Sequence, residues 1–307
     1  CIYQSFQLIG CSALQHDCFQ LRRTHLMKRT LLTCGLIIAL SLLTSAAHAA
    51  TLASDNFESP TAPAALDNAS GGSGWTANWD ATGGASIVSK SLAPPLGPAG
   101  SLQAVLIDAN SGNVMDRSFP AFSGGPLYVG FTIRGENLDT DNFISVQASD
   151  GATANGSQTL GVGFRNQVDN PFYARSGTSG SGQTTNAAQD LTDMTDFRIV
   201  AKFSQNGLEY ETTELFINPM SFVEPLTPDA FATDTDPNMT QLSLFTVRSV
   251  GFGGDDALFI DDLIIADNFT AAAAVTPEPA SIAVWSILGV LCLFGLGYRR
   301  MRGKHNA

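Results

Sequence analysis

Residues 196–217 read Asp-Phe-Arg-Ile-Val-Ala-Lys-Phe-Ser-Gln-Asn-Gly-Leu-Glu-Tyr-Glu-Thr-Thr-Glu-Leu-Phe-Ile. In the first half, the core-facing side chains recur at every second position, at Phe197, Ile199, Ala201 and Phe203. A period of two is typical of a strand with one buried face. The dipeptide at 206–207, Asn-Gly, favours a type I′ turn, whose twist suits an antiparallel pair. This stretch therefore predicts a β-hairpin.

The same alternation recurs along the middle of the chain, first at 127–134, where Leu, Val, Phe and Ile alternate with Tyr, Gly, Thr and Arg. Further candidate strands are 52–58, 85–89, 101–108, 113–119, 143–149, 159–165, 241–252 and 257–266. Gly, Ser, Asn and Asp cluster between them, and no amphipathic helix of useful length interrupts them. About a dozen short strands in one domain predict an all-β, two-sheet sandwich.

Residues 51–275 are strongly acidic, with eight Lys and Arg against twenty-six Asp and Glu and a net charge of about −18. The whole-chain value of −12 hides this, because the remaining basic residues lie near the two ends. Such a surface repels nucleic acid and anionic lipid and keeps the domain soluble. No nucleic-acid partner is expected, and divalent cations are the more natural ligands.

The same 225 residues contain no Cys and no His. Nucleophilic catalysis of the Ser-His-Asp or Cys-His kind needs an imidazole or a thiol, and zinc sites draw mainly on the same side chains. Those chemistries are excluded for this domain, as are disulfides. Its stability must come from a hydrophobic core, for which the length is sufficient.

Near the C-terminus, residues 280–298 form an uncharged, largely apolar run. A helix of this length rises about 30 Å and matches the hydrocarbon core of a bilayer. Basic residues follow at Arg299, Arg300 and Arg302. Because Lys and Arg that flank a span stay on the cytoplasmic side, we expect a single transmembrane helix with a cytoplasmic tail at 299–307 and the rest of the chain outside.

The N-terminal region predicts export. From Met27, two basic residues precede an apolar stretch and an Ala-x-Ala site ending at Ala49, which is the pattern of a secretory signal peptide over 27–49. Cleavage there leaves a mature chain that starts at Ala50. Residues 1–26 lack any clear periodicity, so we interpret them as an over-extended start and expect translation to begin at Met27.

Just before the predicted span, Pro277, Glu278 and Pro279 favour an extended backbone. This motif, followed by one span and an Arg cluster, resembles the bacterial PEP-CTERM sorting signal. The resemblance covers about thirty residues. It implies that the motif is recognised by exosortase, a membrane protease-transpeptidase, in bacteria that make exopolysaccharide. A plain membrane anchor with a Pro-rich stalk is the alternative.

A second resemblance concerns residues 52–269. The hairpin and the closing stretch Phe-Ile-Asp-Asp-Leu-Ile-Ile at 259–265 resemble the concanavalin A-like lectin/glucanase jelly roll, and Asp-Asn-Phe-Glu at 55–58 resembles the first strand of carbohydrate-binding β-sandwich modules. The resemblance implies a jelly-roll ectodomain over 50–270. A linker at 271–279 then leads to the span.

Three functions follow from these observations. The first is a non-catalytic surface or extracellular-matrix protein, anchored in the inner membrane until it is processed and then displayed or released. The second is a lectin-like module for exopolysaccharide, in which Trp75 and Trp79 stack on sugar rings, together with Tyr128, Tyr173 or Tyr210. For both tryptophans a place in the core is an equal alternative.

The third function, a glycoside hydrolase, needs two carboxylates roughly 5–10 Å apart. Glu209, Glu211 and Glu214 lie on one predicted strand, with the first two on the same face. However, the Glu-x-Asp-x-x-Glu motif of the jelly-roll glucanases is absent. A solvated acidic strand is the simpler interpretation, so we expect no catalytic residues.

A structural calcium ion is also predicted. In a jelly roll the first and last strands commonly lie near each other, which would bring Glu58 close to Asp261 or Asp262. Paired carboxylates repel unless a cation lies between them, and calcium takes six to eight oxygen ligands without needing His or Cys. Rival acidic turns occur at 139–142 and 234–236. The alternative is that the carboxylates lie apart in solvent.

Overall fold

A computed structural model describes residues 51–274, except 83, 94, 96–100, 109–111, 140–141, 152–158, 166–170, 178–182 and 235–237. Nearly all regular structure in this part is β-strand, in two antiparallel sheets, so the prediction of an all-β sandwich is confirmed. Within the described residues no helix is long and apolar enough to cross a membrane. The predicted signal peptide at 27–49 and span at 280–298 lie outside these residues.

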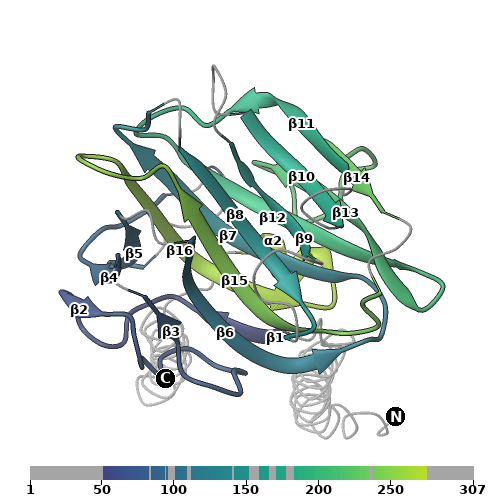
Figure 1. The fold of residues 1–307 in the computed structure, drawn as a ribbon, viewed down its shortest axis with the longest axis horizontal. Coiled ribbons are helices and arrows are strands. Elements are labelled where there is room, and N and C mark those ends of the chain that lie inside the picture. Colours follow the sequence, from purple (N-terminus) through teal and green to yellow (C-terminus); the bar gives the residue numbers. More distant parts are fainter. Residues whose placement is uncertain are drawn as a thin grey trace, which may run out of the picture. The chain divides into compact units, whose positions relative to one another are not determined.

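We call the two sheets A and B (Figure 1). Sheet A runs in the order β14 (Ala230–Thr233), β13 (Glu209–Ile217), β12 (Asp196–Asn206), β7 (Leu127–Glu136), β16 (Ala257–Ala266), β5 (Ala104–Ile107), β4 (Ala85–Val88) and β2 (Ala64–Ala65), with β1 (Thr51–Asp55) also paired to β16. Sheet B runs in the order β11 (Gln183–Asp190), β10 (Pro171–Gly177), β9 (Thr159–Phe164), β8 (Phe143–Ser149), β15 (Leu242–Val250), β6 (Gly112–Phe122) and β3 (Asp80–Ala81).

The main core lies between the sheets, because alternate residues of each strand face the opposite sheet. Sheet A contributes Phe131, Ile199 and Phe203, and sheet B contributes Val146 and Phe172, all of them buried. Figure 1 shows the strands of sheet B lying across β16, β7 and β12 of sheet A. The first strand pairs with the last, as the sequence predicts, with Asp55 opposite Leu263.

The outer face of sheet A is covered by the short helix α2 (Phe269–Ala273), which packs against Tyr128, Val200 and Phe216 in a second apolar cluster. The side chain of Asn268 caps the helix by accepting a hydrogen bond from the backbone of Ala271. Because Ala272 and Ala273 are buried, the packed domain continues to residue 274, beyond the expected start of the linker at 271.

The predicted hairpin forms, but its turn differs from the prediction. Asn206 pairs with Glu209, so the two turn residues are Gly207 and Leu208, one position later than expected. Of these two, only Gly207 has a positive φ, +71°. This is the pattern of a type II′ turn, in which glycine occupies the first central position, rather than type I′.

Five strands escaped the sequence prediction: the two-residue strands β2 and β3, and the longer β10, β11 and β14. Strand β11 lies at the edge of sheet B and is mostly exposed, so its sequence Gln-Thr-Thr-Asn-Ala-Ala-Gln-Asp shows no hydrophobic alternation. Strand β10 begins at Pro171, a residue that lowers the expectation of a strand. Both strands carry one end of the candidate site described next.

Candidate functional site

The outward face of sheet B carries two rows of polar side chains, which the strand register places across the sheet. One row passes through Asp80, Asp116, Thr246, Gln147, Gly161, Arg175 and Thr184. The next passes through Arg248, Ser145, Gly163, Tyr173 and Asn186. Neighbouring members of a row are separated by one strand spacing, about 4.8 Å.

Gly161 and Gly163 leave β9 without side chains in the middle of this face. The gap in the second row allows the ring of Tyr173 to reach over β9 to β8. Its hydroxyl donates a hydrogen bond to the carbonyl of Ile144 at 3.2 Å, and its ring stacks on Phe143 with centroids 5.9 Å apart. A Cβ on Gly163 would lie 2.0 Å from the same carbonyl oxygen, so this position requires glycine.

Three arginines surround Tyr173: Arg165, at the end of β9, Arg175 on β10 and Arg248 on β15. We call these four residues the arginine face. Burial raises the pKa of Tyr173 to about 12, although a hydrogen bond from Ser145 and the charges of all three arginines act to lower it. The hydroxyl is therefore neutral at physiological pH. The arginine face is a cationic region around a buried, neutral tyrosine.

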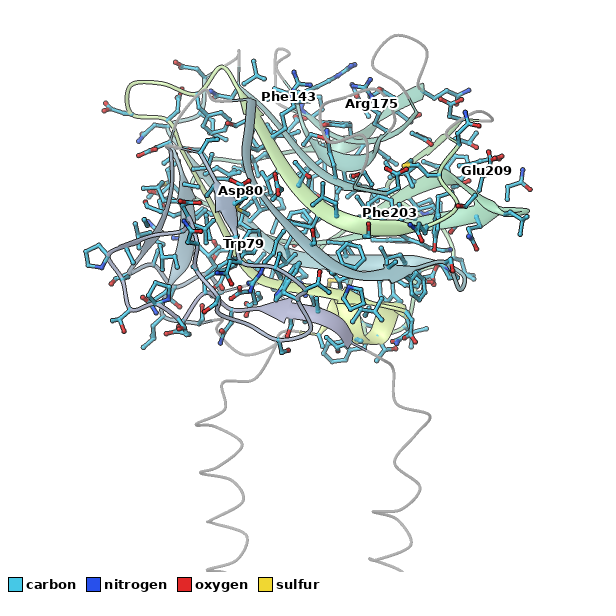
Figure 2. All side chains as sticks on the ribbon, turned by 60° about the horizontal axis from the view of Figure 1, so that its bottom comes forward. Trp79, Asp80, Phe143, Arg175, Phe203 and Glu209 are labelled. Carbon is cyan, nitrogen blue, oxygen red and sulfur yellow. The ribbon has the colours of Figure 1, made fainter. Side chains whose placement is uncertain are left out.

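The three arginines of this face are partly buried residues. The Nε atom of Arg165 is buried and has no hydrogen-bond partner among the described residues. Arg248 lies over the ring of Phe143, with 6.0 Å from its Cζ to the ring centroid. In Figure 2, Phe143 and Arg175 lie along the upper edge of the view, away from Trp79.

Four other basic side chains of the domain are used in ion pairs. Lys90, Arg117, Arg134 and Lys202 each contact a carboxylate within 4 Å. Within the described part of the chain, neither Arg165 nor Arg248 forms an ion pair. These arginines are cationic groups on a domain that is otherwise acidic, and cations of this kind attract anionic ligands.

The opposite end of the same face is acidic. Asp80 and Asp116 lie directly across from each other in the pairing of β3 and β6. Burial and, secondly, the charge of Asp80 raise the pKa of Asp116. Like charges in opposite positions destabilise a strand pair, so this arrangement is not explained by folding alone.

The two tryptophans proposed for sugar stacking belong to the core, the alternative that the sequence left open. Trp79 is 2% exposed and donates its indole N–H to Asp55 at 2.9 Å. Trp75, which is partly exposed, donates to the carbonyl of Ser54, and both rings lie against the guanidinium of Arg117. The guanidinium of Arg117 thus lies against a face of each ring.

The tyrosines named with them are buried too. Tyr128 donates to Glu224 at 2.7 Å beneath α2, and Tyr210 donates to the carbonyl of Gly125 at 2.9 Å in the core. Tyr173 differs from them in lying on the outward face of sheet B, near the three arginines.

The glutamates of β13 have separate partners. Glu211 falls at an irregularity in the β12–β13 register and accepts a hydrogen bond from the side chain of Asn206 at 2.8 Å. Glu214 forms an ion pair with Lys202, with 2.7 Å between the charged atoms. Because Glu211 is the extra residue at this bulge, simple alternation no longer places it on the same face as Glu209.

The acidic residues predicted to bind calcium do come together in part. Asp261 and Asp262 are fully buried at a bulge of β16, and Glu58 is partly exposed beside them. Burial and the charge of Asp262 raise the pKa of Asp261 to about 8, and Glu58 contributes to the same rise. Ser101 and Gln103 connect the two carboxyl groups: Ser101 contacts Asp261 at 2.8 Å, and Gln103 donates to Glu58 at 3.0 Å.

Protein groups also donate to this cluster. The hydroxyl of Ser101 lies 2.5 Å from the carbonyl of Gln103 and 2.8 and 2.9 Å from the two carboxyl oxygens of Asp261. Its hydrogen bond to Asp261 acts to lower the pKa of that carboxyl group, against the larger effect of burial. Among the described residues, no three Asp, Glu, His or Cys side chains converge as metal ligands.

The remaining predicted residues lie elsewhere. In the turn at 139–142, the side chain of Asn142 donates to Asp256 at 3.1 Å, and Asp234 donates its backbone N–H to the carbonyl of Glu211. Their partners Asp141 and Asp236 lie outside the described residues, as do the sorting motif Pro277, Glu278 and Pro279 and the basic residues Arg299, Arg300 and Arg302.

No protein-family model matches the chain, and no curated protein matches it. Among solved structures, the chain is similar to an endo-β-1,4-glucuronan lyase from the fungus Trichoderma reesei, with 10% identity, a TM-score of 0.44 and coverage of 68% of this chain and 95% of the other. It is also similar to a β-1,3-glucanase from Mycobacterium marinum, with 14% identity, a TM-score of 0.41 and coverage of 71% and 99%.

A carbohydrate-binding module from Bacillus subtilis is a third such structure, with 8% identity, a TM-score of 0.37 and coverage of 62% and 95%. These similar structures are glycan-binding or glycan-cleaving proteins of jelly-roll type. Identities and TM-scores this low assign neither a family nor a ligand to this chain, so its function has to be argued from its own residues.

Proposed function

We propose that this chain is an exported bacterial surface protein whose β-sandwich binds a carboxylated polysaccharide on the arginine face. One observation carries the proposal: Arg165, Arg175 and Arg248 gather around Tyr173 on a domain with a net charge of about −18. Guanidinium groups bind carboxylates through two parallel hydrogen bonds, which makes arginine the preferred partner of a planar acid.

The shape of the face favours a polymer over a small acid. The first polar row crosses the strands of sheet B from β3 to β11 and therefore extends over more than 20 Å at about 4.8 Å per strand. An extended chain of uronate units can present one carboxylate after another along such a row. The module is proposed to be non-catalytic, since the hydroxyl of Tyr173, with a pKa of about 12, is a poor base at neutral pH.

We predict that Arg165→Gln, Arg175→Gln and Arg248→Gln each weaken binding to polygalacturonate. Each removes charge-assisted hydrogen bonds worth about 1.5–3 kcal/mol, which corresponds to roughly a 10- to 100-fold rise in Kd. Isothermal titration calorimetry with the purified protein measures the change.

The matched control is Lys90→Gln. It also removes one positive charge, but on sheet A, where Lys90 pairs with Glu136. It should leave the affinity unchanged. If the control weakens binding as much as the three arginine variants, the attraction is a general charge effect and the site is misplaced.

A hydrolase is the second candidate, now supported by a different pair of carboxylates. Asp80 and Asp116 lie across one strand pair at one end of the polar row, and the raised pKa of Asp116 suits a general acid. A reducing-sugar assay on the same polysaccharide distinguishes the two functions. Release of reducing ends that is lost in Asp116→Asn would establish catalysis, whereas binding without product supports the non-catalytic module.

The sorting proposal rests on the C-terminal sequence. We expect an exosortase to act at Pro277, Glu278 and Pro279, so that the mature protein loses its anchor and reaches the cell surface. In a host that has the protease, mass spectrometry should find mature chains that lack residues 299–307. Intact tails on most molecules would contradict processing and favour a permanent anchor.

A calcium ion between Glu58 and Asp261 remains a proposal, supported by their electrostatic contact. Asp261 has a pKa of about 8 when folded and a reference value of 3.8. The folded state therefore holds more protons between these values, and its stability falls as pH rises from about 4 to about 8. In excess EDTA at pH 8, Asp261→Asn should raise the free energy of unfolding by about 1–3 kcal/mol, with little change at pH 4.

If calcium binds, millimolar calcium should make the unsubstituted protein more stable than Asp261→Asn, the reverse of their order in EDTA at pH 8. The unsubstituted protein gains stability by mass action, and Asp261→Asn and Glu58→Gln do not. Thermal melting with calcium and with EDTA measures both effects. No shift in the parent, or an equal shift in Glu58→Gln, removes calcium from this site and leaves the protonated carboxyl as the full account.

A further inference from the structure

The loop between β13 and β14, residues 218–229, carries a patch of exposed apolar side chains. Met220 is 86% exposed, Val223 is 74% exposed and Leu226 is fully exposed, and Phe222 is partly exposed beside them. We call these four residues the apolar tip. The loop borders an open groove of about 500 Å³ at the end of β13. A cluster of this kind on a soluble domain marks a contact surface more often than chance exposure.

The loop is held in place rather than loosely attached. Glu224 accepts hydrogen bonds from Tyr128 and Lys202, both at 2.7 Å, and Asp229 accepts one from the backbone of Ile217 at 2.7 Å. Glu224 is the only charged residue between 218 and 228. Its charge is directed inward and paired, so the apolar tip presents an uncharged surface on an acidic domain.

The apolar tip lies beside the point where the described chain ends. The hydroxyl of Thr270, in α2, donates to the backbone carbonyl of Phe222 at 2.9 Å. Phe269 of the same helix packs on Phe216 at the end of β13, with ring centroids 5.3 Å apart. Four residues after Thr270 the described chain stops, and the remaining 33 residues include the apolar run at 280–298.

We infer that the apolar tip rests in the interface of the lipid bilayer in which the chain is anchored, and so holds the domain against the membrane before release. This inference depends on the proposed membrane span. A short connection from Ala274 keeps the loop within reach of the bilayer surface, and exposed Met, Val, Leu and Phe side chains gain by entering the apolar boundary there. The acidic remainder of the domain faces away.

The test uses the full chain in phosphatidylcholine nanodiscs, with the five cysteines replaced by serine and a nitroxide attached at Val223→Cys or Leu226→Cys. Power-saturation electron paramagnetic resonance compares collisions with oxygen, which concentrates in lipid, and with a water-soluble nickel chelate. The matched control is Leu208→Cys. Leu208 is also apolar and is 80% exposed, but it lies at the opposite end of β13.

At positions 223 and 226 we expect a severalfold higher ratio of oxygen to nickel collisions than at 208. Equal ratios at all three positions, in a chain that resists alkaline extraction from the bilayer, would overturn the inference but leave the anchor intact. Extraction of the chain by alkali would instead disprove the anchor. Spin–spin broadening at 223 would show that a second copy of the chain, not lipid, covers the apolar tip.

Discussion

Replacing Arg117 with methionine should lower the free energy of unfolding by about 3–5 kcal/mol, the cost of breaking a buried ion pair on one side. The Arg117 and Asp55 side chains are 3% and 1% exposed, and their charged atoms lie 2.8 Å apart. Burial raises the pKa of Asp55 and lowers that of Arg117, so the loss of solvation outweighs their attraction. Each charged form is therefore stabilised by the charge of its partner, and removing one leaves the other buried and unpaired.

Arg117 also joins three segments of chain. It donates to the carbonyls of Gly71 and Ala77 at 2.7 and 2.8 Å, and its guanidinium lies over Trp75 and Trp79. The double variant Arg117→Met with Asp55→Asn should regain part of the loss, because no buried charge remains. Thermal unfolding measures both, and a loss of that size lowers Tm by roughly 6–20 °C.

The comparison for this variant is Lys90→Met. Lys90 and Glu136 form a partly exposed pair, with 27% and 15% of the side chains accessible, so its loss should cost less than about 1 kcal/mol. Similar small losses in Arg117→Met and Lys90→Met would mean that the buried pair does not stabilise the fold as described.

Arg198→Met should lower the free energy of unfolding by about 3–5 kcal/mol, as much as Arg117→Met. It should also detach α2 from sheet A. Arg198 is fully buried and donates to the carbonyls of Ala272 at 2.6 Å, Ala274 at 2.7 Å and Asp262 at 3.0 Å. Burial lowers its pKa to about 10, against the charges of Asp262 and Asp261, which raise it. Its loss removes a cation from beside two buried acidic groups and removes the donors to Ala272 and Ala274 at the end of α2.

Hydrogen exchange should detect this change locally, as faster exchange at 269–274 than in the strands of sheet A. Lys202→Met is the matched control, because it lies on the same face of β12 but pairs with Glu214 and Glu224 near solvent. It should cost less than about 1 kcal/mol. Unchanged exchange at 269–274 in Arg198→Met would contradict the assigned role.

The sequence predicted the architecture well wherever one face of a strand is buried. Strands β8 and β16 occupy 143–149 and 257–266, as expected, because Val, Ile, Leu and Phe alternate or run continuously there. The prediction was wrong at the hairpin turn, because the residue pairing moved the bend from 206–207 to 207–208. Turn type depends on which residues pair across the strands, and composition does not determine that register.

The arginine face could not be predicted, since its members come from three strands separated by up to 83 residues of sequence. One signal was present: Arg165, Arg175 and Arg248 each follow an apolar residue that faces the core, namely Phe164, Ala174 and Val247. Alternation therefore placed all three outward. Only the pairing of β8, β9, β10 and β15 shows that they share one face of one sheet.

The most direct test of the central claim measures the Kd of the full chain for polygalacturonate and for the same polymer with its carboxyl groups reduced to alcohols. At an ionic strength of about 0.15 M, the Debye length of about 8 Å screens the repulsion between the acidic domain and the polymer. We expect the carboxylated polymer to bind and the reduced polymer to bind at least about tenfold more weakly, since charge-assisted hydrogen bonds are lost. Equal affinity for both polymers, or no binding to either, would contradict the account.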